Sequence, residues 1–134
     1  MNSFNVGGIQ VAETERDIVL VDYGTAIVTV ERVQDVLDKI EEVWGRRRVT
    51  VLVRAASLVD LAGVASVLED RDQADFTVAS AIVSTSKVAG LLANLYMRLQ
   101  RSPYPVRHFT DEQKAMEWLR MHLVADEKYV LAED

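Results

Sequence analysis

The chain has 134 residues, of which 49% are hydrophobic and 27% are charged, and its formal net charge is −6. This length is typical of one domain and buries a sizeable core without covalent staples. The acidic balance argues against a general nucleic-acid surface, which needs clustered excess lysine and arginine. The absence of cysteine excludes disulfides, thiolate nucleophiles and cysteine-ligated zinc.

Neither a leader nor a membrane span is predicted. Residues 1–5 lack the basic region and apolar run of a signal peptide. No apolar stretch reaches the roughly 18 residues needed to cross a bilayer. We therefore expect a cytoplasmic protein.

The first third of the chain changes its hydrophobic period. Residues 9–11 and 18–21 are predicted strands on either side of the polar turn 13–17, and their closeness predicts an antiparallel hairpin. A helix is then predicted between an N-cap at Thr29 and a stop at Gly45. Its apolar face recurs at three- and four-residue steps, at Val30, Val33, Leu37, Ile40 and Trp44.

The rest of the chain alternates strands and helices. Residues 49–53 and 78–83 are apolar runs typical of strands buried on both faces, and residues 106–109 fit an edge strand beside Pro105. Helices are predicted over residues 61–68 and 86–100, and after a capping box at residues 110–113. Residues 126–134 are expected to form an acidic tail, outside a single domain of residues 1–125.

This order predicts an α/β fold. The expected sheet is mixed and mostly parallel, with five strands that begin as an antiparallel hairpin. Right-handed crossovers then place four helices on both faces of the sheet.

The most specific stretch of the sequence is 105–119, where an edge strand ends in Phe109 and a capped helix carries Ala115 and Trp118-Leu119. With the element order, it resembles the STAS fold of sporulation anti-anti-sigma factors, over residues 9–123. The chain looks closest to the uncharacterised STAS-like proteins related to those factors and to CRAL-TRIO lipid-binding domains. These motifs serve packing, so they bear on fold more than on function.

The resemblance also implies a regulatory turn after the central strand. Anti-anti-sigma factors carry an Asp-Ser-Ser-Gly-like turn there, and phosphorylation of a serine in it controls partner binding. The matching stretch here is Asp60-Leu61-Ala62-Gly63, whose two middle residues have no hydroxyl. A phosphoryl switch at those two positions is chemically impossible. Ser57 and Ser66 are nearby, but neither occupies the matching position.

A ligand site, if one exists, is expected at the carboxyl ends of the parallel strands, where open α/β sheets form their crevice. An anion at the helix start after residue 83 is one interpretation, and simple N-capping is the other. Arg54 would either reach a ligand carboxylate or form a plain ion pair, for example with Asp60. The candidate ligand-binding residues are Arg54, Asp60, Ser84, Ser86 and Lys87.

No other motif supports chemistry. Arg46-Arg47-Arg48 would contact phosphate or, more simply, follow a helix C-terminus as solvated cations. His108 and His122 have no metal-binding spacing, and the sequence has no nucleophile elbow, P-loop or dinucleotide fingerprint. We therefore expect no cofactor, no metal and no enzymatic activity.

The helix predicted over residues 86–100 is apolar nearly all round. One stripe packs on the sheet, and a second stripe lies about 120° away from it by the helical step. Either a second copy of the chain covers this second stripe, in a two-fold homodimer, or another part of the same chain does. The candidate interface residues are Ala89, Ala93, Tyr96 and Met97.

Two functions remain in view. The first is a non-enzymatic STAS-like protein-interaction module without the phosphorylatable serine. The second is a small-molecule or lipid carrier of the CRAL-TRIO type, for an apolar or anionic ligand. A carrier needs an internal pocket with apolar walls, whereas an interaction module can be solid.

Overall fold

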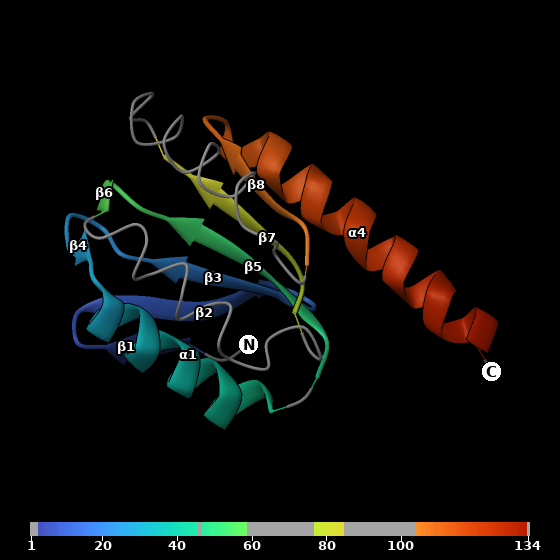
Figure 1. Ribbon diagram of the computed structural model, residues 1–134, viewed down its shortest axis with the longest axis horizontal. Helices are drawn as coiled ribbons and strands as arrows, with labels where there is room; N and C mark the ends of the chain where they lie inside the picture. The colour runs from blue at the N-terminus through green and yellow to red at the C-terminus, as the bar shows by residue number, and fades with distance from the viewer. Residues whose placement is uncertain (1–2, 46, 59–76, 85–103, 134) are drawn as a thin grey trace.

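The structure, a computed structural model, describes residues 3–45, 47–58, 77–84 and 104–133 (Figure 1). Its main sheet has six strands in the order β1-β2-β3-β5-β7-β8. The two pairings among the first three strands are antiparallel, and the remaining three are parallel. The strands are β1 (Ser3–Val6), β2 (Ile9–Glu15), β3 (Ile18–Asp22), β5 (Val49–Arg54), β7 (Thr77–Val83) and β8 (Val106–Phe109).

The predicted mixed, mostly parallel sheet is confirmed, but its strand number was wrong because β1 adds a sixth strand. Ser3 and Asn5 are exposed and alternate with half-buried Phe4 and Val6, which is the period of an edge strand. A tight turn at Gly7 and Gly8, with φ of 56° and 90°, returns the chain into β2. A separate parallel pair joins β4 (Ile27–Val28) to β6 (Ser57–Leu58).

The structure describes two helices, α1 (Val30–Trp44) and α4 (Glu112–Glu133), not the four expected. The other two predictions, over residues 61–68 and 86–100, lie outside the described residues. The N-cap of α1 is confirmed, because the Thr29 side chain accepts from the Arg32 backbone N–H at 3.3 Å. Neither described helix is long and apolar enough to span a membrane.

The last helix differs from its prediction at both ends. The predicted capping box places the N-cap at Thr110, but the helix begins one residue later than that box requires, so Asp111 is the N-cap. The Asp111 Oδ1 atom accepts a hydrogen bond from the Gln113 backbone N–H at 2.9 Å. The acidic tail predicted over residues 126–134 is instead part of α4 as far as Glu133. No glycine or proline interrupts this stretch, and it is rich in good helix formers.

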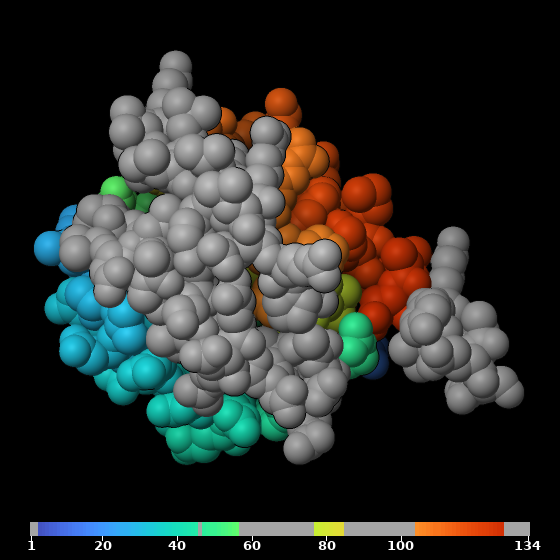
Figure 2. Space-filling view, in the orientation of Figure 1, coloured from blue at the N-terminus to red at the C-terminus, as the bar shows by residue number. Residues whose placement is uncertain are grey.

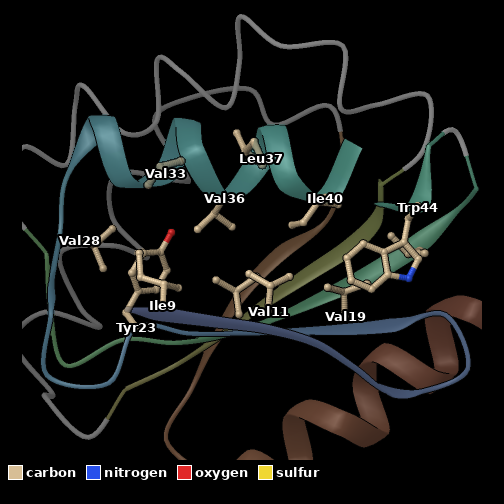
Figure 3. Close-up of a cluster of buried hydrophobic side chains, with 12 residues drawn as sticks. Ile9, Val11, Val19, Tyr23, Val28, Val33, Val36, Leu37, Ile40 and Trp44 are labelled. Carbon is tan, nitrogen blue, oxygen red and sulfur yellow. The ribbon is translucent and has the colours of Figure 1, made fainter. Parts of the chain in front are cut away.

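The sheet separates two cores. Figure 3 shows the side chains of α1 over one face, and the buried members include Val19 and Val21 of β3 and Trp44. On the other face, Leu119 and Ala115 of α4 pack on Ile18 and Leu20 of the same strand. Because successive strand residues point to opposite faces, β3 supplies both cores and is apolar from Ile18 to Val21.

Candidate functional site at the carboxyl ends of the strands

The carboxyl ends of β3 and β5 bring a small charged cluster together. Asp22 and Arg54 are paired positions at the ends of these two parallel strands. Glu112 comes from the first turn of α4, which packs against β5 and β7. Thus three distant parts of the sequence meet where a ligand crevice is expected in an open α/β sheet.

Arg54 connects the two carboxylates of this cluster. Its Nε and Nη2 bind both oxygens of Glu112, the second at 2.7 Å, and its Nη1 donates to Asp22 Oδ2 at 3.2 Å. This two-pronged contact matches the planar fork of guanidinium to a carboxylate. Arg54 is therefore engaged in ion pairs, the simpler of the two roles that the sequence left open. Asp60, the partner considered from the sequence, lies outside the described residues.

The interactions within the cluster keep Glu112 and Arg54 in their charged forms. The hydrogen bonds and charge of Arg54 lower the pKa of Glu112 from its ordinary value of 4.5, against a smaller opposing effect of burial. Hydrogen bonding to Glu112 and Asp22 raises the pKa of Arg54 in turn. Glu112 is thus a carboxylate at neutral pH, whereas a general acid or base needs a pKa near the working pH.

Ser84 lies beside this cluster, directly after β7, and is buried with 7% of its surface exposed. Its backbone N–H donates to the carbonyl of Phe109 at 3.1 Å, so this donor extends the sheet toward β8. Ser86 and Lys87, the other residues of the proposed anion site, lie outside the described part of the chain. The structure therefore brings together Arg54 and Ser84 from the predicted set of five.

Two residues of the cluster, Asp22 and Glu112, were not identified from the sequence as site residues. Asp22 directly follows a predicted strand, and Glu112 lies at the start of a predicted helix. A carboxylate at such a position is the signal by which the sequence could have pointed to these two residues. The sequence does not show that α4 begins beside the carboxyl end of β5, because Glu112 lies 58 residues after Arg54 in the chain. That placement depends on the whole parallel sheet.

His108 on β8 is the one unusual polar group near this edge. Its Nε2 is buried and has no hydrogen-bond partner in the part of the chain that the structure describes. Burial lowers the pKa of His108, and a hydrogen bond with the Ser84 backbone acts against this effect. His108 is adjacent to Phe109, which packs toward α4, so strand alternation directs the imidazole to the opposite face of the sheet.

The described residues of the basic run at residues 46–48, Arg47 and Arg48, form ion pairs within the domain. Arg47 pairs with Glu13 and with Asp17, the latter through Nε to Oδ1 at 2.6 Å. Arg48 makes a bidentate contact with Asp126 of α4, with Nε–Oδ2 at 2.9 Å and Nη2–Oδ1 at 2.7 Å. These two guanidinium groups bind carboxylates of the same domain, as favourable partners for cations of this kind.

The proposed interface of the third helix is not described. Ala89, Ala93, Tyr96 and Met97 all lie outside the described residues, and self-association through them stays a prediction. As for metal binding, no group of three or more suitable side chains occurs within the described ranges.

Comparisons with known proteins agree with the fold. A family model described as Domain of unknown function (DUF7793) matches residues 12–123. No curated protein matches the sequence. A solved structure of an uncharacterized protein from the DUF3478 family with a SpoIIAA-like fold, from Shewanella loihica PV-4, is similar with a TM-score of 0.58 and 14% identity. The match covers 83% of this chain and 91% of that chain.

At this identity the structural match shows the fold alone, and it supports the STAS-like resemblance seen in the sequence. The family match extends over most of the chain, from within β2 to within α4. The chain therefore belongs to the DUF7793 family and has a SpoIIAA-like α/β fold.

Proposed function

We propose that this domain is a non-enzymatic protein-interaction module. The observation that carries the proposal is the Arg54 cluster at the carboxyl ends of the strands, where each charged group has a partner from the same chain. An anionic ligand at Arg54 would have to displace two carboxylates. A catalytic role for Glu112 is disfavoured, because its lowered pKa removes it from acid–base chemistry near neutral pH.

The module is further proposed to work without the phosphoryl switch of anti-anti-sigma factors. The sequence Asp60-Leu61-Ala62-Gly63 has no hydroxyl at the two middle positions, so neither can accept a phosphoryl group. Partner binding would then be set by the presence and concentration of the partner. The simplest form of such binding is self-association into a symmetric homo-oligomer.

A small-molecule carrier is the second candidate, and one observation favours it. The buried Nε2 of His108 lacks a hydrogen-bond partner among the described residues, and a buried polar atom of this kind costs about 1–3 kcal/mol if left unpaired. A polar ligand group at that atom would remove the cost. The carrier and the interaction module differ in whether the isolated protein retains such a ligand.

Native mass spectrometry of the protein purified from its host separates the two functions. We expect the chain to appear with a second protein chain, its own copy or another, and without a small molecule. A monomer that retains a stoichiometric small molecule would contradict the interaction module and support the carrier. A chain detected at micromolar concentration as a monomer with no bound molecule would also count against the proposal.

A further inference from the structure

Two arginines at opposite ends of β5 each bind a carboxylate of α4. Arg48, directly before the strand, makes a bidentate contact with Asp126, with Nε–Oδ2 at 2.9 Å and Nη2–Oδ1 at 2.7 Å. Arg54, the last residue of the strand, binds both oxygens of Glu112. The helix therefore runs antiparallel to β5 and is joined to it at two points.

The spacing of these two contacts matches on the strand and on the helix. Arg48 and Arg54 are six residues apart, which spans about 20 Å in a strand that rises roughly 3.3 Å per residue. Glu112 and Asp126 are 14 residues apart, which spans about 21 Å in a helix that rises about 1.5 Å per residue. This separation is also close to four helical turns, so both carboxylates leave α4 on the same side.

Apolar packing holds mainly the first half of α4. Ala115 and Leu119 have no exposed surface and lie in the core between the helix and the sheet. From residue 120 to residue 127, no side chain in this described stretch is buried, although Leu123 is partly buried and packs against the same core. Figure 1 shows the second half of α4 continuing past the sheet, and the helix lies at one margin of the molecule in Figure 2.

Two ion pairs join this second half to the sheet. Besides the contact of Asp126 with Arg48, Arg120 binds both oxygens of Glu15 at the end of β2, with Nε–Oε2 at 2.9 Å. The side chains of Arg120 and Glu15 are 47% and 42% exposed, whereas that of Asp126 is only 18% exposed. Water and salt screen an enclosed pair less than an exposed one, so the contact of Asp126 is the stronger of the two.

We propose that residues 120–133 of α4 form an arm that opens separately from the rest of the domain, with the Arg48–Asp126 pair as its latch. Opening breaks two ion pairs and the packing of Leu123, and stretches with so few buried apolar contacts open at a lower free energy than the core. The first half of the helix stays in place, because its core residues and the ion pair at the end of β5 anchor it. Each opening uncovers Leu123 and the apolar surface on which it packs, so the latch controls access to that surface.

Hydrogen exchange of the backbone amides, followed by NMR at low salt, tests the arm residue by residue. Arg48→Gln and Asp126→Asn should each speed exchange of the protected amides in residues 120–133 about fivefold, the upper end of the range for a surface ion pair, and leave residues 115–119 unchanged. Asparagine and aspartate have similar helix propensities, so the faster exchange reports the lost contact. The double variant should exchange no faster than the faster single variant, because the pair is already broken.

Arg47→Gln is the matched control. The substitution is the same, at the neighbouring residue, and it also removes ion pairs, but these join Arg47 to Glu13 and Asp17, neither of which lies on α4. Exchange in residues 120–133 should therefore stay at the wild-type rate. Raising the salt from about 0.05 M to about 0.5 M should speed exchange of the wild-type arm toward that of the latch variants, and change the variants less.

Several results would overturn the proposal. Equal acceleration of residues 115–119 and 120–133 would mean that α4 opens as one unit, and a wild-type arm without protection at low salt would mean that no latch holds it. Additive effects of the two latch substitutions, or an equal effect of Arg47→Gln, would show that the Arg48–Asp126 contact does not hold the arm.

Discussion

Replacing Trp44 with alanine is expected to lower the free energy of unfolding by about 3–5 kcal/mol. Trp44 ends α1 and is only 6% exposed. Its ring contacts Phe4 of the edge strand edge-on, with centroids 6.1 Å apart, and its Nε1 donates to Glu13 Oε1 at 3.1 Å. Alanine removes these contacts together and leaves a cavity where α1 meets the first two strands.

Urea unfolding of Trp44→Ala and Trp44→Phe measures this effect and separates its parts. Phenylalanine keeps most of the ring but donates no hydrogen bond to Glu13, so it should lose a smaller share of the stability. If Trp44→Ala lost less than about 1 kcal/mol, the typical effect of an unselected substitution, the packing of α1 on β1 and β2 would be wrong.

Leu119→Ala is expected to cost about 2–5 kcal/mol of unfolding free energy. Leu119 has no exposed surface and lies at the centre of the core between α4 and the sheet. Its neighbours in that core include Leu52 of the central strand and Phe109 of β8. The truncated side chain would leave a void among rigid strand residues that can collapse only partly.

Met121→Ala provides the control for this second prediction. It removes a side chain of similar size two residues along the same helix, but from a position that is 60% exposed. At concentrations where the protein is monomeric, its effect should stay within about 0.5 kcal/mol. Equal losses for the two variants, measured by chemical denaturation, would contradict the orientation of α4 on the sheet.

The parallel half of the sheet was predictable because its signals are local. The strands β5 and β7 are short runs of apolar residues, and β3 is buried on both faces, so each stands out without knowledge of its neighbours. The helix α1 combines a cap at Thr29, a stop at Gly45 and a regular apolar face. Where several local signals agree, sequence and structure agree too.

The errors arise where local signals are weak. The strand β1 has four residues, two of them polar, and only the Gly7-Gly8 turn marks it as half of a hairpin. The C-terminal segment was predicted to be a tail because it is acidic, yet its helix propensity and the Arg48–Asp126 contact extend α4. Composition alone does not separate a charged helix from a charged tail.

The charged cluster could be predicted only in part. Arg54 at the end of a central strand was identified, together with the option of an ion pair, since strand ends meet at one edge of a parallel sheet. Its partners could not be chosen, because many carboxylates are available in the sequence and only the tertiary fold selects Asp22 and Glu112.

The most direct test of the central claim is the pH dependence of unfolding for the wild type and Glu112→Gln. The claim is that the charged side chains at the carboxyl ends of the strands stabilise the fold by pairing with each other, and are not left unpaired to bind a ligand. Because Arg54 lowers the pKa of folded Glu112, this pair stabilises the fold above the unfolded value of about 4.5. That stability is lost as the pH falls through the lowered pKa of the folded state.

The wild type should therefore be more stable than Glu112→Gln at pH 7, by about 0.5–1 kcal/mol for a pair that remains partly exposed to water. The difference should shrink as the pH falls below 4.5, and it should be smaller at pH 7 in an Arg54→Met background, where the partner is missing. A Glu112→Gln variant as stable as the wild type at pH 7, or one whose loss is equally large without Arg54, would contradict the claim.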